Sequence, residues 1–231
     1  MTQLNWQQQP IKLVRSNKRK TIGLYVKERQ IEVRAPHHVA VSELTDFIHS
    51  KQQWLIKVLA EQAQQITEKP DFSVRRHIPF IGKQLKVQIV QGNKLGWRDE
   101  DERLILYAKN QEKNHIHHLL ADFYLTKAKY VLHNKTLDLV STLNWQHKLT
   151  DIRFRRTKTK WGHCTATGRI QYNWLILMAP ESVIDYLIAH EVSHLKHLNH
   201  SEQFWQQVQA IHPSYQLDRK WLKDNGHTLV L

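Results

Sequence analysis

Three histidines and one glutamate near the end of the chain have the types and spacing that metal-dependent hydrolysis requires. His190, Glu191 and His194 form an H-E-x-x-H motif, and His200 follows six residues later. Residues four apart share one face of a helix, so His190 and His194 can bind one zinc ion while the glutamate reaches a metal-bound water. With His200 as third ligand, one coordination position stays open. The pattern predicts one catalytic zinc per chain, with Glu191 as general base.

The surrounding elements must place these residues together. H-E-x-x-H also arises by chance, and the chain has 16 His. However, Pro180 suits a first helical turn, and apolar residues recur at helical spacing through the motif. Ser201 can cap a second helix over 202–210, which leaves His200 in the turn between the helices. His197 is the alternative third ligand, but a continued helix would carry it one turn beyond the metal.

The rest of the chain has a strand-rich first half and a helical second half. We expect strands over 11–15, 21–27, 31–34, 78–81, 84–90 and 103–108, and helices over 41–65 and 111–143. These elements predict an α+β fold, with an N-terminal α+β region over 1–110 and a catalytic domain over 111–231. Residues 149–177 are expected to form a strand, a loop and a second strand over 169–176. That second strand, just before the motif helix, is our candidate edge for binding an extended peptide.

The charge balance indicates a polyanionic partner. Lys and Arg total 34 against 21 Asp and Glu, which gives a net charge of +13 and a pI near 9.8. The excess gathers in two clusters: Lys12, Arg15, Lys18, Arg19 and Lys20, then Arg153, Arg155, Arg156, Lys158 and Lys160. We expect non-specific nucleic acid to bind this basic surface. A solvated basic surface that only aids solubility is the alternative.

Other features of the composition narrow the class of protein. Cys164 is the only cysteine, which excludes a disulfide framework and a Cys-rich zinc site. We expect it to be a small buried residue, and Trp161 and Trp205 to pack in the core. No apolar run could span a bilayer, and the first ten residues lack the apolar core of a signal peptide. A cytoplasmic protein without a membrane partner is expected.

The order of several short motifs is more specific than H-E-x-x-H. Residues 159–164 read Thr-Lys-Trp-Gly-His-Cys, then come Asn173-Trp174-Leu175 and Ala179-Pro180, and Asn199-His200-Ser201 and Phe204-Trp205 follow the motif. This succession resembles the YgjP-like metal-dependent hydrolases, relatives of the SprT-like proteases that degrade DNA-crosslinked proteins. The resemblance covers nearly the whole chain. It implies a zincin-like helical metallopeptidase half with a small antiparallel sheet, in which His190, His194 and His200 bind zinc. The chain departs from the family at His163, where a small serine is usual.

Three classes of function are compatible with these residues. The first is a zinc metallopeptidase acting on peptides or proteins. The second is a metal-dependent nucleotide phosphohydrolase of pyrophosphatase type, because the same water and base can attack phosphorus. The third is a nucleic-acid-binding module with a structural zinc. Arg156, Lys160 and His163 are the candidate contacts for a substrate or anion.

Overall fold

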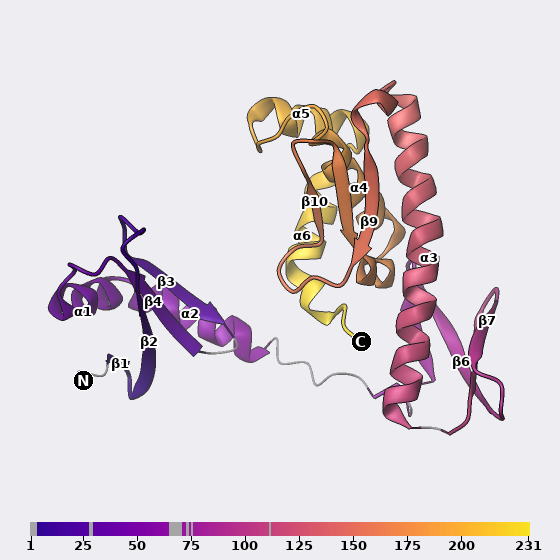
Figure 1. The fold of residues 1–231 in the computed structure, drawn as a ribbon, viewed down its shortest axis with the longest axis horizontal. Coiled ribbons are helices and arrows are strands. Elements are labelled where there is room, and N and C mark those ends of the chain that lie inside the picture. The colour runs from indigo at the N-terminus through magenta and orange to yellow at the C-terminus, as the bar shows by residue number, and fades with distance from the viewer. Residues whose placement is uncertain (1–3, 28–29, 65–70, 73, 75, 111) are drawn as a thin grey trace. The chain divides into compact units, whose positions relative to one another are not determined.

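The computed structural model describes residues 4–27, 30–64, 71–72, 74, 76–110 and 112–231, which form two compact units, Met1–Glu68 and Lys69–Leu231 (Figure 1). The described residues contain three small mixed sheets and six α-helices, which confirms the expected α+β class. The boundary expected between 110 and 111 falls inside the second unit. Leu106 before it and Ile116 after it share one core. The expected helix ends at Gln65 and Gln111 lie outside the described residues.

The first unit is a sheet covered by two helices. Its elements are β1 (Asn5–Trp6), β2 (Gln9–Arg15), β3 (Gly23–Lys27), β4 (Gln30–Ala35), α1 (Val41–Ser50) and α2 (Gln52–Gln64), with strand order β1-β2-β4-β3. Alternation along β4 buries Ile31, Val33 and Ala35. The prediction of a single helix over 41–65 was wrong, because the chain leaves helical geometry at Lys51 (φ −106°). The apolar stripe continues across this break, so periodicity could not reveal it.

The second unit begins with a four-stranded sheet and a long helix. The elements are β5 (His77–Phe80), β6 (Lys83–Gln91), β7 (Gly96–Glu100), β8 (Arg103–Ala108) and α3 (Lys113–Thr142), with strand order β5-β6-β8-β7. The sequence did not predict β7, because its residues Gly-Trp-Arg-Asp-Glu lack an apolar alternation. This edge strand is held to α3 by a hydrogen bond from Trp97 Nε1 to Asp122 (2.8 Å). Figure 1 shows α3 running past this sheet and on to β9.

A three-stranded sheet follows α3 and the 3₁₀ turn η1 (Gln146–Lys148). It consists of β9 (Asp151–Arg155), β10 (Gly162–Cys164) and β11 (Arg169–Asn173) in the order β10-β11-β9. The sheet is mixed rather than antiparallel, since β9 and β11 run parallel. The predicted end of the strand over 169–176 was also wrong, because β11 ends at Asn173. Asn173 accepts a hydrogen bond from Leu175 N (3.2 Å) and starts the 3₁₀ turn η2 (Trp174–Met178). Because β11 is central, β10 and β9 are the two edges of this sheet, and β10 is the edge strand that contacts α4.

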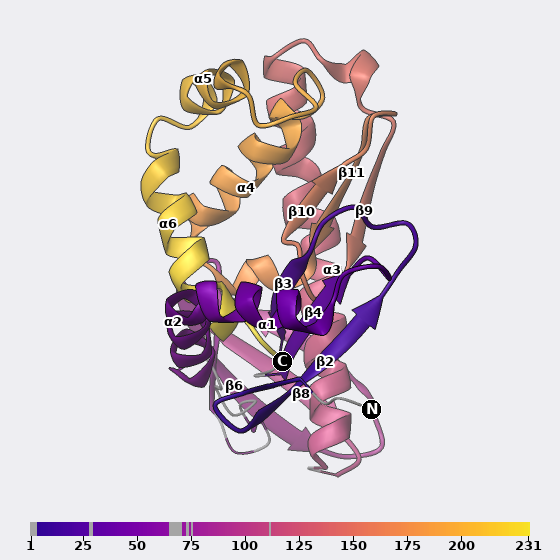
Figure 2. The ribbon, with the colours of Figure 1, turned by 90° about the vertical axis from the view of Figure 1, so that its left-hand side faces the viewer.

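Three helices complete the second unit: α4 (Glu181–Ser193), α5 (Glu202–Ile211) and α6 (Tyr215–Asn225), followed by η3 (Gly226–Thr228). Helix α4 contacts β10 on one side and α5 and α6 on the other (Figure 2). Most of its residues are therefore buried. Within the described residues, we find no helix that is both long and apolar enough to cross a membrane.

Candidate metal centre

Helix α4 places the first two histidines on one face. It starts after Pro180 and ends at Ser193, and His194 keeps helical angles (φ −67°, ψ −17°) at the C-cap. The four-residue spacing therefore holds up to His194. The ring centroids of His190 and His194 lie 5.0 Å apart.

The third histidine reaches the same place from the turn after α4. Ser201 caps α5 by accepting a hydrogen bond from Phe204 N (3.4 Å), and His200 lies immediately before this cap. His200 Nε2 is 3.1 Å from His190 Nε2. One ligand atom from each of His190, His194 and His200 lies within 4.8 Å of the others.

His197 occupies a different position from these three. Its main-chain carbonyl oxygen is 2.9 Å from His194 Nδ1. A proton on Nδ1 of His194 donates to this carbonyl and leaves Nε2 free to bind a metal. His197 therefore orients a histidine of the cluster through its backbone.

Aromatic side chains of α5 hold the histidine rings. Trp205 stacks on His200, with centroids 5.6 Å apart and an interplanar angle of 20°. Phe204 packs on His194 at 4.4 Å. Trp205 also stacks on Tyr215 at 5.5 Å, so the wall continues onto α6. Both Trp205 and Trp161 pack against the core, as expected, but the packing of Trp205 also fixes the ring of His200.

The electrostatics of the cluster favour neutral imidazoles. Burial, followed by the nearby rings of His194 and His200, lowers the pKa of His190 to about 3. Burial also lowers the pKa of His194. Neutral imidazole is the form that binds a metal ion. Two nitrogens about 2.05 Å from a tetrahedral zinc would be roughly 3.3 Å apart, close to the 3.1 Å between the Nε2 atoms of His190 and His200. The three side chains could therefore hold a metal ion.

Glu191 lies between the histidines and β10. Its side chain is 3% exposed, and burial raises the pKa of its carboxyl to about 8, against the opposing charge of Lys160. Its Oε2 atom is buried and has no hydrogen-bond partner among the described residues. A buried carboxylate oxygen without a partner calls for a group outside the chain, such as a bound water or ion.

Glycine at position 162 makes room for this carboxylate. A Cβ atom there would lie 2.2 Å from Glu191 Oε1, far inside van der Waals contact. Backbone and carboxylate therefore meet directly.

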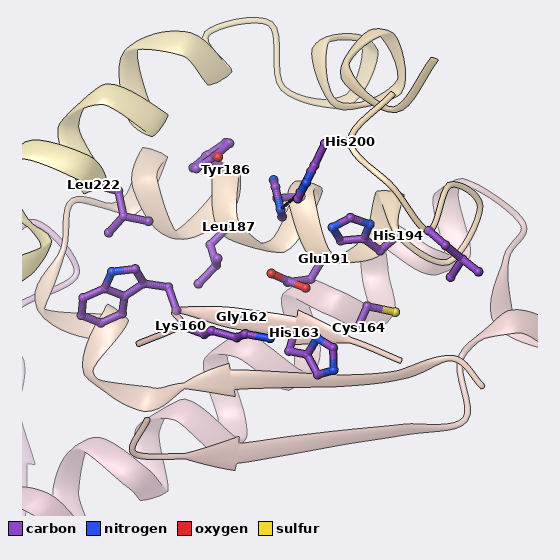
Figure 3. A pocket seen from close by; sticks show the side chains of 13 residues that line it. Lys160, Gly162, His163, Cys164, Tyr186, Leu187, Glu191, His194, His200 and Leu222 are labelled. Atoms are coloured by element: carbon purple, nitrogen blue, oxygen red, sulfur yellow. Dashed lines mark hydrogen bonds between the residues drawn. The ribbon is translucent and has the colours of Figure 1, made fainter. Parts of the chain in front are cut away.

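The cluster opens into a pocket of about 420 Å³ (Figure 3). Its lining comprises Lys160, Trp161, Gly162, His163, Cys164, Tyr186, Leu187, His190, Glu191, His194, Leu198, His200 and Leu222. Two of the three candidate contacts, Lys160 and His163, are thus brought to the site. Arg156 is not, because its guanidinium donates to the main-chain oxygen of Leu231 (3.0 Å). Cys164 is half-buried, and burial raises the pKa of its thiol to about 12.

Asn173 supports this pocket, although sequence reasoning gave it no role. Its side chain is buried, and Nδ2 donates to Thr157 O (3.0 Å). The Thr157 hydroxyl in turn donates to Lys160 O. Asn173 therefore fixes the loop that presents Lys160. The signal in the sequence was a polar residue directly before the apolar run 174–179.

Two residues of β10 have main-chain groups near Glu191 that pair with no other described strand. Asn173 N donates to Trp161 O (2.7 Å), and Thr165 N donates to Arg169 O (2.9 Å). Gly162 pairs with Tyr172, so bonding residues alternate along the antiparallel ladder. The main-chain groups of Gly162 and Cys164 consequently face away from β11, at the open edge of the sheet.

The second basic cluster is partly neutralised. Arg153 and Arg155 project from the same side of β9, as alternation requires, and both are exposed. Arg153 Nε lies 2.7 Å from Asp151 Oδ2, however, and Arg156 is bound to Leu231. The other three cations of the cluster, Arg155, Lys158 and Lys160, form no ion pair or side-chain hydrogen bond with the described residues.

The model of the YgjP-like family, described as a metallopeptidase domain, matches residues 20–225. That range includes both the pocket and the histidine cluster. No curated protein and no solved structure matches the chain.

Proposed function

The chain belongs to the YgjP-like metallopeptidase family, and we propose that it is a zinc-dependent peptidase whose centre is His190, His194 and His200. One observation carries the proposal. The buried Glu191 carboxylate has an oxygen without a hydrogen-bond partner among the described residues, and it lies against the edge strand β10. A candidate base, a histidine cluster that could bind a metal and an edge strand that could bind a peptide therefore lie together.

The donor set favours zinc. Three neutral imidazoles with one position left open are typical of catalytic zinc, whereas Mg²⁺ and Ca²⁺ prefer oxygen ligands. A zinc ion held there supplies a Lewis acid and a water of lowered pKa. The open position also argues against the structural zinc of a binding module, which has four protein ligands.

Glu191 acts as general base and then as general acid. Its carboxylate accepts a proton from the attacking water and then delivers it to the nitrogen of the departing amine. Burial raises the pKa of Glu191 to about 8, and the positive charge of Lys160 opposes this rise and so favours the ionised, proton-accepting form. Because Oε2 makes no competing hydrogen bond to the described residues, it is free for this role.

The free edge of β10 aligns the substrate. An extended peptide can add to the sheet by bonding the outward main-chain groups of Gly162 and Cys164. Its backbone then runs over Glu191, within reach of the metal centre. Two pocket residues, Lys160 and Tyr186, can donate to the carbonyl oxygen as negative charge develops on it. Burial raises the pKa of Tyr186 to about 12, so its hydroxyl keeps its proton at neutral pH.

Nucleotide hydrolysis has weaker support. Among the described residues that line the pocket, Lys160 is the one Lys or Arg. Sites that act on triphosphates use several cations or backbone cradles for the phosphates. The remaining walls of this pocket suit an uncharged peptide better than a triphosphate.

The experiment is a comparison of substrates. Zinc-loaded protein is incubated with an unstructured protein and, separately, with nucleoside triphosphates. We expect peptide fragments, abolished by a chelator and restored by zinc. Glu191→Gln should keep its zinc and lose about 10²- to 10⁴-fold in rate. Triphosphate turnover with the protein substrate intact would overturn the peptidase proposal in favour of the phosphohydrolase.

A further inference from the structure

The pocket extends beyond the metal centre along α4. Tyr186 and Leu187 lie one helical turn before His190 and Glu191 respectively, so the same two faces of the helix continue past the site. Figure 3 shows Tyr186, Leu187 and Leu222 on one side of Glu191 and Cys164 on the other. The pocket therefore has an extension that holds no metal-binding histidine.

The walls of this extension are mainly apolar. Leu187 comes from α4, Leu222 from α6, and Trp161 from the residue before β10. We call the space bounded by Trp161, Tyr186, Leu187 and Leu222 the Trp161 chamber. Both leucines are almost fully buried, with exposed fractions of 4% and 8%. The leucines therefore belong to the packed walls of the pocket.

The position of Trp161 depends on a glycine behind it. A Cβ atom on Gly226 would lie 3.0 Å from Trp161 Nε1 and 3.3 Å from two further indole atoms. The indole therefore lies flush against the start of η3. This contact keeps a half-buried tryptophan at the pocket wall, where it lines the recess as well as packing on the core.

We infer that the Trp161 chamber is a specificity subsite that takes a bulky apolar side chain, such as Leu or Phe, next to the scissile peptide bond. This inference rests on the proposed peptidase function. Trp161 directly precedes Gly162, so a chain paired with Gly162 and Cys164 would pass the indole as it leaves the carboxylate. An apolar side chain gains the free energy of burial against the indole and both leucines. A charged side chain would lose its hydration there without gaining an ion pair from these walls.

Two measurements test the subsite. Zinc-loaded protein is incubated with a mixed peptide library, and cleavage sites are mapped by mass spectrometry. Leu or Phe should be enriched at a single position flanking the cut. Matched peptides that differ only there, Phe against Ala, should differ in kcat/KM by about tenfold or more. The zinc-loaded Glu191→Gln variant should bind peptides without turnover. In calorimetry it should bind the Phe peptide more tightly than the Ala peptide.

Substitutions in the chamber should change this preference. Leu222→Trp fills the recess and should move the preference to Ala, while Leu222→Ala should widen tolerance for large residues. The matched control is Leu217→Ala, on the same helix but 72% exposed, which should leave the cleavage profile unchanged. Zinc content and circular dichroism identify any variant that fails to fold. If a Leu222 variant fails to fold, Trp161→Phe is tested in its place, and it should weaken the preference for Phe.

The outcomes separate the two proposals. Cleavage without apolar enrichment, or an unchanged profile in folded Leu222 variants, would overturn the subsite and leave the peptidase proposal intact. A folded, zinc-loaded protein that cleaves none of the library would overturn both.

Discussion

Glu191 and Gly162 meet face to face: a Cβ atom on the glycine would be 2.2 Å from the Oε1 atom of the carboxylate. The contact joins the helix that carries His190 and His194 to the edge strand β10, along which we propose that a substrate binds. No other residue type leaves room for the carboxylate at its present position. This relationship gives the first prediction.

Gly162→Ala should retain zinc and lose at least tenfold in peptidase rate. The methyl group must displace either the carboxylate or β10, and a misplaced base is a poor proton acceptor. Rate and metal content are measured on the same preparation. The matched control is Gly92→Ala, because a Cβ there meets nothing within 4 Å. Equal loss in both variants would show that the effect is not specific to Glu191.

Zinc binding should distinguish His200 from His197. His190→Ala and His194→Ala should abolish stoichiometric zinc, and His200→Ala should weaken binding strongly, because each removes one of three nitrogens. His197→Ala should retain zinc, since the contact to His194 comes from its main-chain carbonyl. Metal analysis after dialysis is the measurement. Loss of zinc in His197→Ala with retention in His200→Ala would reverse the assignment.

The metal-free protein should become less stable as the pH rises from about 6.5 to about 8. The pKa of Glu191 is raised from 4.5 to about 8 in the folded state, so its proton stabilises the fold and is lost through this window. The pKa of His190 is lowered from 6.5 to about 3, so that residue destabilises the fold only below about pH 6.5. One proton gives a slope of at most about 1.4 kcal/mol per pH unit.

Urea unfolding in the presence of a chelator, at several pH values, measures this dependence. Glu191→Gln should flatten the curve between pH 6.5 and 8, because Gln does not titrate. A slope that persists in the variant would assign the effect to another group.

We also predict salt-dependent binding of nucleic acid through the second basic cluster. Arg155, Lys158 and Lys160 are exposed cations that form no ion pair with the described residues, whereas Arg153 is paired with Asp151. Arg155→Glu with Lys158→Glu should weaken binding of DNA or RNA without changing zinc content. For each phosphate that the double variant no longer neutralises, the log–log salt slope should fall by roughly 0.7 to 0.9. Arg153→Glu should have a smaller effect. Affinity that does not respond to salt would remove nucleic acid as a partner of this surface.

The spacing of the histidines along the sequence determined the histidine cluster. Helical periodicity fixes residues four apart on one face, and Ser201 fixes where the next helix starts, so local sequence was enough to bring His190, His194 and His200 together. The alternating pattern of β4 and the apolar stripe of α1 and α2 are local in the same way, and the α+β class followed from them.

Only the tertiary structure decided which strand places its backbone against Glu191. β10 is three residues long, too short for a period of two to stand out, and it becomes the edge only because β11 pairs with β9 on its other side. The contact of Gly162 with Glu191 and the supporting bond from Asn173 to Thr157 join segments that are distant along the chain. The same packing decided that Arg156 bonds to Leu231 at the end of the chain instead of facing the pocket. Such pairings depend on how separate elements pack, and neither spacing nor composition within one segment encodes them.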